Sequence, residues 1–196
     1  MDRERFERQR DFILEIDREK EVLRQTHITG YARREDDAEH AWHMAVMAYL
    51  LGEYANEPVD IARTMIMCLV HDVVEIDAGD SYAYDSSAQA THVERETRAA
   101  ERIFGLLPDD QAADLRALWE EFEADETPEA RFARAMDNVQ PLMLNDSNGG
   151  RDWVAHDVSI HETRGRNATT RLGPAELADY VEERFEANVE KGSLRP

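Results

Sequence analysis

The chain has 196 residues, a length typical of one domain that can bury a core of its own. Asp and Glu number 43 against 23 Lys and Arg, which gives a formal net charge of -20. A field of this sign repels nucleic-acid phosphates and anionic membranes, so we expect neither nucleic acid nor a membrane as a partner. A phosphate-bearing small ligand would need local cations, such as a metal ion and a few arginines.

The distribution of apolar residues and of cysteine favours a cytoplasmic protein. No run approaches about 18 uncharged apolar residues, the length of a transmembrane helix. The segment "MDRERFERQRDFILEIDREK" is densely charged and lacks the apolar core of a signal peptide. Cys68 is the single cysteine and lies in an apolar run, so we expect it to pack in the core of a protein from a reducing compartment.

Apolar spacing along the chain is helical almost throughout, and no alternating pattern predicts a strand. The first helix carries a partial apolar stripe, formed by Phe6, Ile13, Leu14, Ile16 and Leu23. A loop is expected over residues 27–40, with Gly30 as a helix breaker and Asp36 or Asp37 as the cap of the next helix.

Two helices with marked apolar faces come next. The helix predicted over 38–55 places on one face His40, Met44, Met47 and Leu51. The helix predicted over 59–74 opens near Pro58 and Asp60. Its inner stripe is predicted to be Ile61, Met65, Leu69 and Asp72.

The second half of the chain is also predicted to be helical. In order, we expect an irregular loop at 77–90, helices near 91–105 and 109–124, a helix from Thr127 that is kinked or ends near Pro141, a loop at 145–153, and an amphipathic helix at 173–190. No linker is long enough to separate domains. Residues 1–196 are therefore predicted to form a single all-α domain.

Three of these helices carry side chains of the types that commonly bind metals, on or beside an apolar stripe: His40, then His71 with Asp72, then Asp137. Two imidazoles and two carboxylates suit Mn, Fe, Co, Ni or Zn better than Ca. Each residue alone has an ordinary explanation, since His40 could be a hydrogen-bonded core histidine and Asp137 an ion-pair partner. Their joint occurrence predicts one divalent transition metal per chain.

The same residues give the chain its resemblance to a known family. The segments "DAEHAWHMAVMA", "HDVVEIDAGD" and "LLPDD…LWEEFEADETPEARFARAMD" occur in this order. They resemble the H…HD…D pattern of HD-domain metal-dependent phosphohydrolases, and most closely their 5'-deoxynucleotidase branch and its bacterial relatives. The resemblance covers about residues 12–145 and leaves 146–196 as a C-terminal helical extension.

This resemblance implies a helical bundle with a metal held between core helices by His40, His71, Asp72 and Asp137. It also implies catalytic roles for Glu75 and Asp80. Glu75 lies three residues after Asp72, on nearly the same helix face, and could orient the attacking water or take its proton. Asp80 could accept a hydrogen bond from a sugar hydroxyl. The alternatives are a surface ion pair for Glu75 and a turn or cap for Asp80.

Arg33 and Arg34 are the candidates for phosphate binding, because they precede the first ligand helix and guanidinium suits phosphate. The chain departs from the branch here, since its loop is shorter and an expected upstream arginine has no clear counterpart near His27 and Ile28. The remaining histidines are predicted to be structural or exposed: His43, His92, His156 and His161. An apolar stripe indicates core or dimer contact: Leu115, Leu118, Trp119 and Phe122.

The sequence thus predicts a metal-dependent phosphohydrolase that converts (deoxy)nucleoside 5'-monophosphates to nucleoside and phosphate. Its partner would be a small phosphate ester, and a homodimer is expected. Two alternatives stay open. One is a phosphodiester or nucleoside triphosphate hydrolase with the same metal core, and the other is a catalytically silent HD-fold interaction protein.

Overall fold

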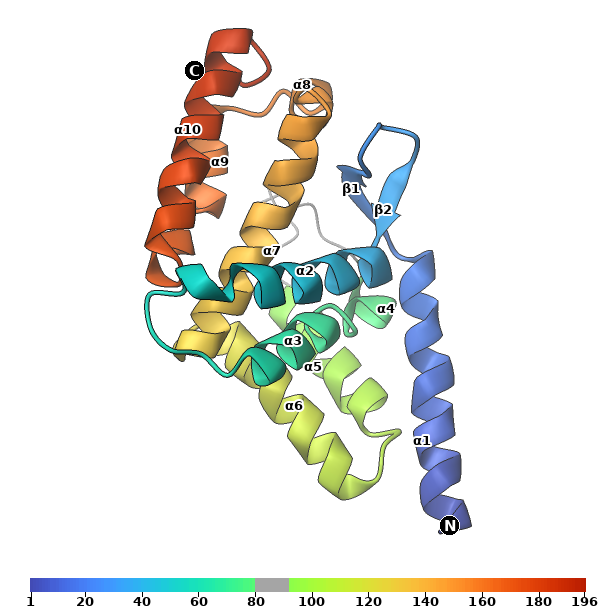
Figure 1. Ribbon diagram of the computed structural model, residues 1–196. Coiled ribbons are helices and arrows are strands. Elements are labelled where there is room, and N and C mark those ends of the chain that lie inside the picture. Colours follow the sequence, from blue (N-terminus) through green and yellow to red (C-terminus); the bar gives the residue numbers. More distant parts are fainter. Residues whose placement is uncertain (80–91) are drawn as a thin grey trace.

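The computed structural model describes residues 1–79 and 92–196, and these residues form an almost wholly helical molecule with one small sheet (Figure 1). The first half contains α1 (Arg3–Ile16), the 3-10 helix η1 (Asp17–Glu21), β1 (Leu23–His27), β2 (Arg34–Asp36), α2 (Asp37–Leu51), the 3-10 helix η2 (Gly52–Tyr54), α3 (Ile61–Val70) and α4 (Glu75–Ala78). The second half contains α5 (His92–Phe104), α6 (Asp109–Ala124), α7 (Pro128–Ser147), α8 (Arg151–Ala155), α9 (Ile160–Arg166), the 3-10 helix η4 (Thr170–Leu172) and α10 (Ala175–Lys191). The predicted all-α fold class is confirmed.

Polar caps begin the three helices that carry the predicted metal ligands. Asp36 and Glu39 form a capping box at the start of α2, which selects Asp36 over Asp37 as the cap. The Asp60 side chain accepts a hydrogen bond from the Arg63 amide at the start of α3. Thr127 caps α7, whose first residue is Pro128. These signals fix where each helix begins, and hence which residues face inward.

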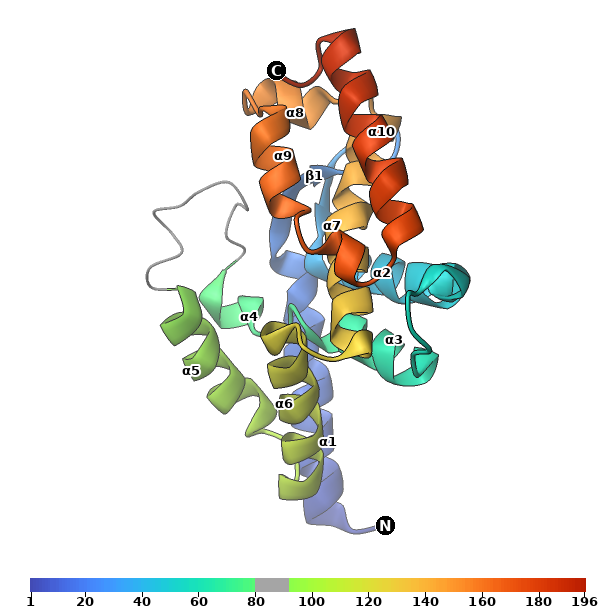
Figure 2. The same cartoon turned by 90° about the vertical axis from the view of Figure 1, so that its left-hand side faces the viewer.

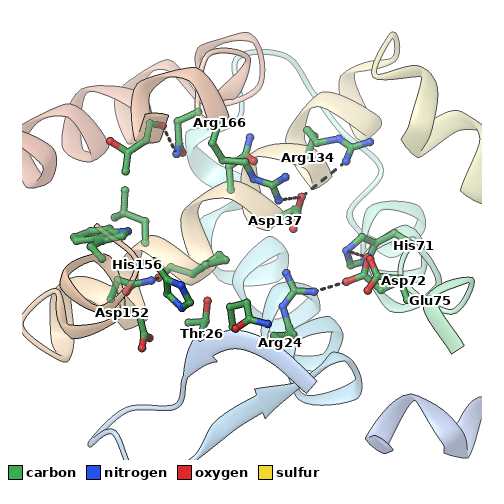
Figure 3. Close-up of a pocket in the computed structure, with 18 of the residues that line it drawn as sticks. Arg24, Thr26, His71, Asp72, Glu75, Arg134, Asp137, Asp152, His156 and Arg166 are labelled. Atoms are coloured by element: carbon green, nitrogen blue, oxygen red, sulfur yellow. Dashed lines mark hydrogen bonds and ion pairs between the residues drawn. The ribbon is translucent and has the colours of Figure 1, made fainter. Parts of the chain in front are cut away.

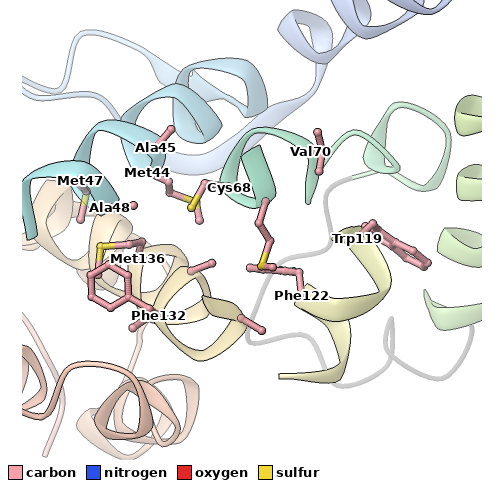
Figure 4. Packing of buried hydrophobic residues seen from close by; sticks show 14 of the residues in the cluster. Met44, Ala45, Met47, Ala48, Cys68, Val70, Trp119, Phe122, Phe132 and Met136 are labelled. Atoms are coloured by element: carbon pink, nitrogen blue, oxygen red, sulfur yellow. The ribbon is translucent and has the colours of Figure 1, made fainter. Parts of the chain in front are cut away.

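The core lies where α2, α3 and α7 meet (Figures 1 and 4). Small residues on α2 such as Ala45 and Ala48 are buried, which allows the neighbouring helices to approach closely. Cys68 has no exposed surface, so its predicted role in core packing is confirmed. Met44 and Met136 fill the space between α2 and α7.

The helix α7 continues past Pro141 to Ser147, so the prediction that it could end there is wrong. Proline removes one backbone hydrogen bond and costs about 3 kcal/mol inside a helix. Burial of the helix on several sides offsets this cost, since Val139, Gln140 and Leu142 are all buried around the proline.

Two predicted apolar stripes are correct only in part, since Ile16 on α1 and Met65 on α3 pack against the core but other members do not. On α1 it is Phe12 that is buried, whereas Ile13 and Leu14 are 60% and 64% exposed. On α3 the buried residues include Met67 and Cys68, while Leu69 is 40% exposed. The face of α2, in contrast, is confirmed for its buried members, His40, Met44 and Met47.

The strands β1 and β2 and the helices α8 and α9 were not predicted. The strands pair antiparallel, with Leu23 opposite Asp36 and His27 opposite Arg34, and the hairpin lies against α7 and α8. Figure 2 shows α8, α9 and α10 grouped beside one end of α7, with α5 and α6 toward the other end. The hairpin and the helices α8 and α9 lie beside α7. None of the helices that the structure describes is long and apolar enough to cross a bilayer.

Candidate metal centre and active-site pocket

The structure brings the four predicted metal ligands together from α2, the end of α3 and α7. Figure 3 shows three of them, His71, Asp72 and Asp137. One ligand atom each from His40, His71 and Asp72 lies within 4.8 Å of the others. Asp137 joins them, with its Oδ1 3.2 Å from His40 Nε2. All four side chains are buried. Such a concentration of polar groups is costly in a core unless a cation or hydrogen bonds compensate it.

A chain of hydrogen bonds behind His40 fixes which ring nitrogen carries the proton. The Gln140 Nε2 group donates to Glu35 Oε1 at 2.6 Å and to His43 Nδ1 at 3.0 Å. This orientation turns Gln140 Oε1 toward His40 Nδ1, 2.9 Å away, so Nδ1–H must be the donor. Burial lowers the pKa of His40 to about 4, so the ring is neutral near pH 7. Its Nε2 lone pair therefore faces the carboxylates.

His71 is oriented in the same way by the backbone. Its Nδ1 donates to the carbonyl of Cys68, one turn earlier, at 2.9 Å. Its Nε2 lies 3.0 Å from Asp72 Oδ1, but in a direction that makes no hydrogen bond, and no other described residue hydrogen-bonds to it. Burial alone would lower the pKa of His71, but the Asp72 carboxylate outweighs this effect and raises it.

The Nε2 atoms of His40 and His71 thus lie 3.2 and 3.0 Å from carboxylate oxygens of Asp137 and Asp72, and a divalent cation would stabilise this arrangement. The donor set of His40, His71, Asp72 and Asp137 fits Mn, Fe, Co, Ni or Zn, as predicted from the residue types. A divalent metal therefore belongs to the chemistry of this donor set.

Arg24 on β1 is a site residue that the sequence analysis missed. Its buried guanidinium donates from Nη1 to Asp72 Oδ2 at 2.8 Å and to Asp37 Oδ1 at 3.2 Å. Burial alone would raise the pKa of Asp72, but His71 and Arg24 lower it far below its ordinary value. An arginine upstream of α2 therefore does reach the site. It lies three residues before His27, the position near which the family pattern predicts an arginine.

Two further arginines, also missed, lie on the other side of the ligands. Arg166 Nη2 is 2.9 Å from Asp137 Oδ2, and Arg134 Nη1 is 3.8 Å from the same oxygen. Although burial would raise the pKa of Asp137, Arg166 and His40 lower it well below its ordinary value. The carboxylates of Asp72 and Asp137 are consequently ionised and paired with guanidinium groups.

The remaining predicted site residues are placed differently. Glu75 is buried at the start of α4 and lines the same cavity as Asp72. Asp80 lies outside the described residues. Arg33 pairs with Glu39 on the surface, and Arg34 is exposed. Neither arginine lines the cavity, so the structure brings Glu75 to the ligands but leaves Arg33 and Arg34 away from them.

The other histidines and the residues of the apolar stripe lie partly near the site or in the core and partly on the surface. His43 lies behind His40 through Gln140, and His161 is exposed. His156, expected on the surface, is exposed but also lines the cavity. The side chain of His92 is not among those described. In the stripe, Leu118, Trp119 and Phe122 are buried in the core, and the Phe122 ring centre is 4.7 Å from that of His71.

The cavity beside the ligands has a volume of about 430 Å³. Charged groups line it beside the ligands, among them Arg24, Glu75 and Arg166. Its lining also includes amides, a hydroxyl and apolar rings: Asn138, Asn145, Thr163, Asn167, Trp153 and Phe185. Most of these uncharged residues come after residue 145, beyond the range of the motif, which is why motif spacing did not predict them.

The helical fold and the order of the four candidate ligands, His40, His71, Asp72 and Asp137, are typical of one class of protein. The comparison with known families identifies the same class. The model of the HD domain matches residues 16–176. The chain belongs to the HD domain family.

Individual relatives support this membership. A protein from Magnetospirillum magnetotacticum described as a predicted metal-dependent phosphohydrolase is 47% identical, with a TM-score of 0.93 over 98% of this chain and 96% of that one. The 5'-deoxynucleotidase HDDC2 of Danio rerio is 32% identical over 120 residues, 59% of this chain and 58% of that protein. The 5'-deoxynucleotidase hdd1 of Schizosaccharomyces pombe is 25% identical over 84% of this chain and 85% of its own length. The match thus spans little more than half the length of the zebrafish relative.

Proposed function

We propose that the protein is a metal-dependent phosphohydrolase that cleaves (deoxy)nucleoside 5'-monophosphates to nucleoside and inorganic phosphate. The observation that carries this proposal is a cluster of four buried metal-type ligands, three of which line one cavity of about 430 Å³ together with Glu75 and guanidinium groups. The names of the 5'-deoxynucleotidase relatives support the choice of substrate.

The residues of the chain divide the reaction among them. A bound divalent cation would polarise a phosphate oxygen and lower the pKa of water close to it. Glu75 orients that water and takes its proton. The water oxygen forms a new bond to phosphorus as the P–O5' bond breaks, and the nucleoside oxygen leaves as a hydroxyl with the proton that Glu75 took from the water.

The nucleoside would contact the uncharged residues of the cavity. Asn138 and Asn167 offer both donors and acceptors there, and Trp153 offers an apolar face. Asp80 remains our candidate for a hydrogen bond to the sugar, and Arg33 and Arg34 remain candidates for phosphate contact. Arg24 is a stronger candidate than either, because its guanidinium already borders the ligand cluster.

A panel of phosphate esters tests the proposal. Purified protein loaded in turn with Mn, Co, Fe, Ni or Zn is assayed for phosphate release from matched deoxy and ribo 5'-monophosphates, nucleoside triphosphates and phosphodiesters. We expect the monophosphates to react fastest, with the deoxy form preferred by up to about a hundredfold, the usual limit of exclusion by shape. Equal rates for both sugars would contradict the sugar preference alone.

The same panel decides between the proposal and its alternatives. Faster turnover of triphosphates or phosphodiesters would favour a different hydrolase with the same metal core. A protein that binds no metal and hydrolyses none of the esters would be a silent interaction protein, contrary to our proposal. A homodimer and a cytoplasmic setting complete the proposed picture, and sedimentation of the purified protein would test the dimer.

A further inference from the structure

The helix α9 ends at Arg166, whose guanidinium pairs with the candidate ligand Asp137 (Figure 3). A capping box of Ser159 and Glu162 begins this helix. Asn167, just beyond its last residue, donates from Nδ2 to the Thr163 carbonyl at 3.1 Å. The helix is therefore fixed at both ends. Arg166 extends from it into the cavity, where its side chain remains 33% exposed.

The three arginines of the cavity differ in how firmly they are held. Arg24 is bound to two carboxylates and its side chain is only 11% exposed. Arg134 lies over the Phe122 ring, 3.8 Å from its centre, and donates to the Phe122 carbonyl at 3.1 Å. Arg166, in contrast, is held at its guanidinium by the ion pair with Asp137. It is thus the arginine that can turn with the least loss of contacts.

The two carboxylate oxygens of Asp137 contact different groups. Oδ1 faces His40, and Oδ2 accepts from Arg166 at 2.9 Å. A divalent cation bound by Asp137 and His40 would draw electron density from the same carboxylate and repel a guanidinium beside it. A phosphate ester entering the cavity brings two negative charges to that place. The guanidinium then has a better partner than the carboxylate it leaves.

We propose that Arg166 is a phosphate-binding residue, and that Asp137 holds its guanidinium in reserve until metal and phosphate arrive. This inference rests on the proposed function, because it places the substrate phosphate between the metal ligands and α9. It also assigns a role to the C-terminal extension, which the motif does not cover: α9 supplies an anion-binding side chain to the site.

A merely structural ion pair makes a different prediction. If Arg166 served only to keep Asp137 in place, its removal would misplace the carboxylate and weaken metal binding. If Arg166 competes with the metal for Asp137, its removal leaves metal affinity unchanged or increases it. The sign of the change in metal affinity therefore separates the two roles, without any measurement of turnover.

The experiment compares Arg166→Met with a matched control, Arg164→Met. Arg164 lies on the same helix but pairs with Glu182 of α10 on the surface. For each protein we measure by calorimetry the affinity for Mn²⁺ alone, and then the affinity of the Mn-loaded protein for inorganic phosphate. We expect Arg166→Met to bind phosphate about ten- to a hundredfold more weakly, the usual effect of losing a charge-assisted hydrogen bond, with Mn²⁺ affinity equal or higher. Arg164→Met should match the wild type in both.

Two results would overturn the inference: wild-type phosphate affinity in Arg166→Met, or weaker Mn²⁺ binding in that variant. Arg166→Lys provides a second variant that keeps the positive charge in the folded protein. It should show an intermediate phosphate affinity, since an ammonium group cannot bind phosphate in the bidentate manner of guanidinium. If Mn-loaded wild-type protein bound no phosphate at all, the proposed function would fail together with the inference.

Discussion

The imidazoles and the charged side chains of the candidate metal centre are held in place in different ways. His40 and His71 are oriented by uncharged hydrogen-bond acceptors, the Gln140 side chain and the Cys68 carbonyl. Around them, Arg24 and Arg166 pair with the carboxylates through ion pairs. The imidazoles are thus fixed whether or not a cation is present. The charged groups, in contrast, have partners that a metal and a phosphate can replace.

This difference indicates how a chain with a net charge of -20 prepares a site for an anionic substrate. Arginines neutralise the buried carboxylates before the metal binds, which keeps the core stable. The same arginines are then available to the phosphate.

Removing a ligand should have the largest effect. Asp137→Ala and His71→Ala each delete one of four ligands, so we expect both variants to lose stoichiometric metal and all detectable hydrolysis. Metal content after gel filtration and phosphate release measure the two consequences. Asp114→Ala on the exposed face of α6 and His161→Ala are controls of the same residue types. Full metal content and normal turnover in either ligand variant would refute the assignment.

Glu75→Gln should separate chemistry from metal binding. The substitution preserves the size of the side chain but removes the base, so metal content should stay at the wild-type level. We expect kcat to fall by about two to four orders of magnitude, the usual contribution of general acid–base catalysis. Steady-state kinetics with a deoxynucleoside 5'-monophosphate measure this. A variant with wild-type kcat would show that Glu75 is structural.

Gln140→Leu tests the fixed side of the comparison. The leucine cannot accept the Nδ1–H of His40, so the ring is free to adopt the tautomer that places its proton on the metal side. Loss of a hydrogen bond behind a metal ligand typically weakens metal affinity by about 10- to 100-fold. Titration with Co²⁺ measures the affinity. Unchanged affinity with a normal melting temperature would indicate that the core alone orients His40.

Sequence patterns predicted the parts of this site that are local along the chain. His40, Met44 and Met47 share a face of α2 because helical spacing places them there. Arg24 and Arg166 could not be found in this way, since their carboxylate partners lie 48 and 29 residues away in the sequence. Charged side chains carry no periodic signal, and only the packing of distant segments decides which of them line a cavity.

The same reasoning explains why the sequence pattern failed to predict several elements of the fold. The strand β1 (Leu23–His27) has no clear alternation, because every residue in it is partly or fully exposed and it pairs with a single short strand. The helices α8 and α9 are too short, at 5 and 7 residues, to show a helical period. On α1 the buried face follows contact with α5, where Phe12 stacks near Phe104, rather than the densest run of apolar residues.

The smallest expected effect concerns Glu19, a buried carboxyl group on the 3-10 helix η1. Burial, and after it the negative charge of Asp72, raises the pKa of Glu19 to about 8 from an ordinary value near 4.5. The folded protein therefore binds a proton at Glu19 more tightly than the unfolded chain does. It follows that the free energy of unfolding decreases as the pH rises from about 4.5 to about 8, and is lower by a constant amount above that.

Glu19→Gln should remove this part of the pH dependence, because glutamine resembles the protonated carboxyl group at every pH. Urea unfolding of metal-free protein at pH 5 and pH 9 measures it. We expect similar stabilities at pH 5 and a gain of roughly 1–2 kcal/mol for the variant at pH 9, well below the limit set by about 1.4 kcal/mol for each unit of pKa shift. The exposed Glu21→Gln is the matched control on the same 3-10 helix. A variant that is less stable than the wild type at pH 9 would mean that ionised Glu19 has a stabilising partner. The carboxyl group would then belong with the paired charges of the cavity rather than with the groups that burial keeps neutral.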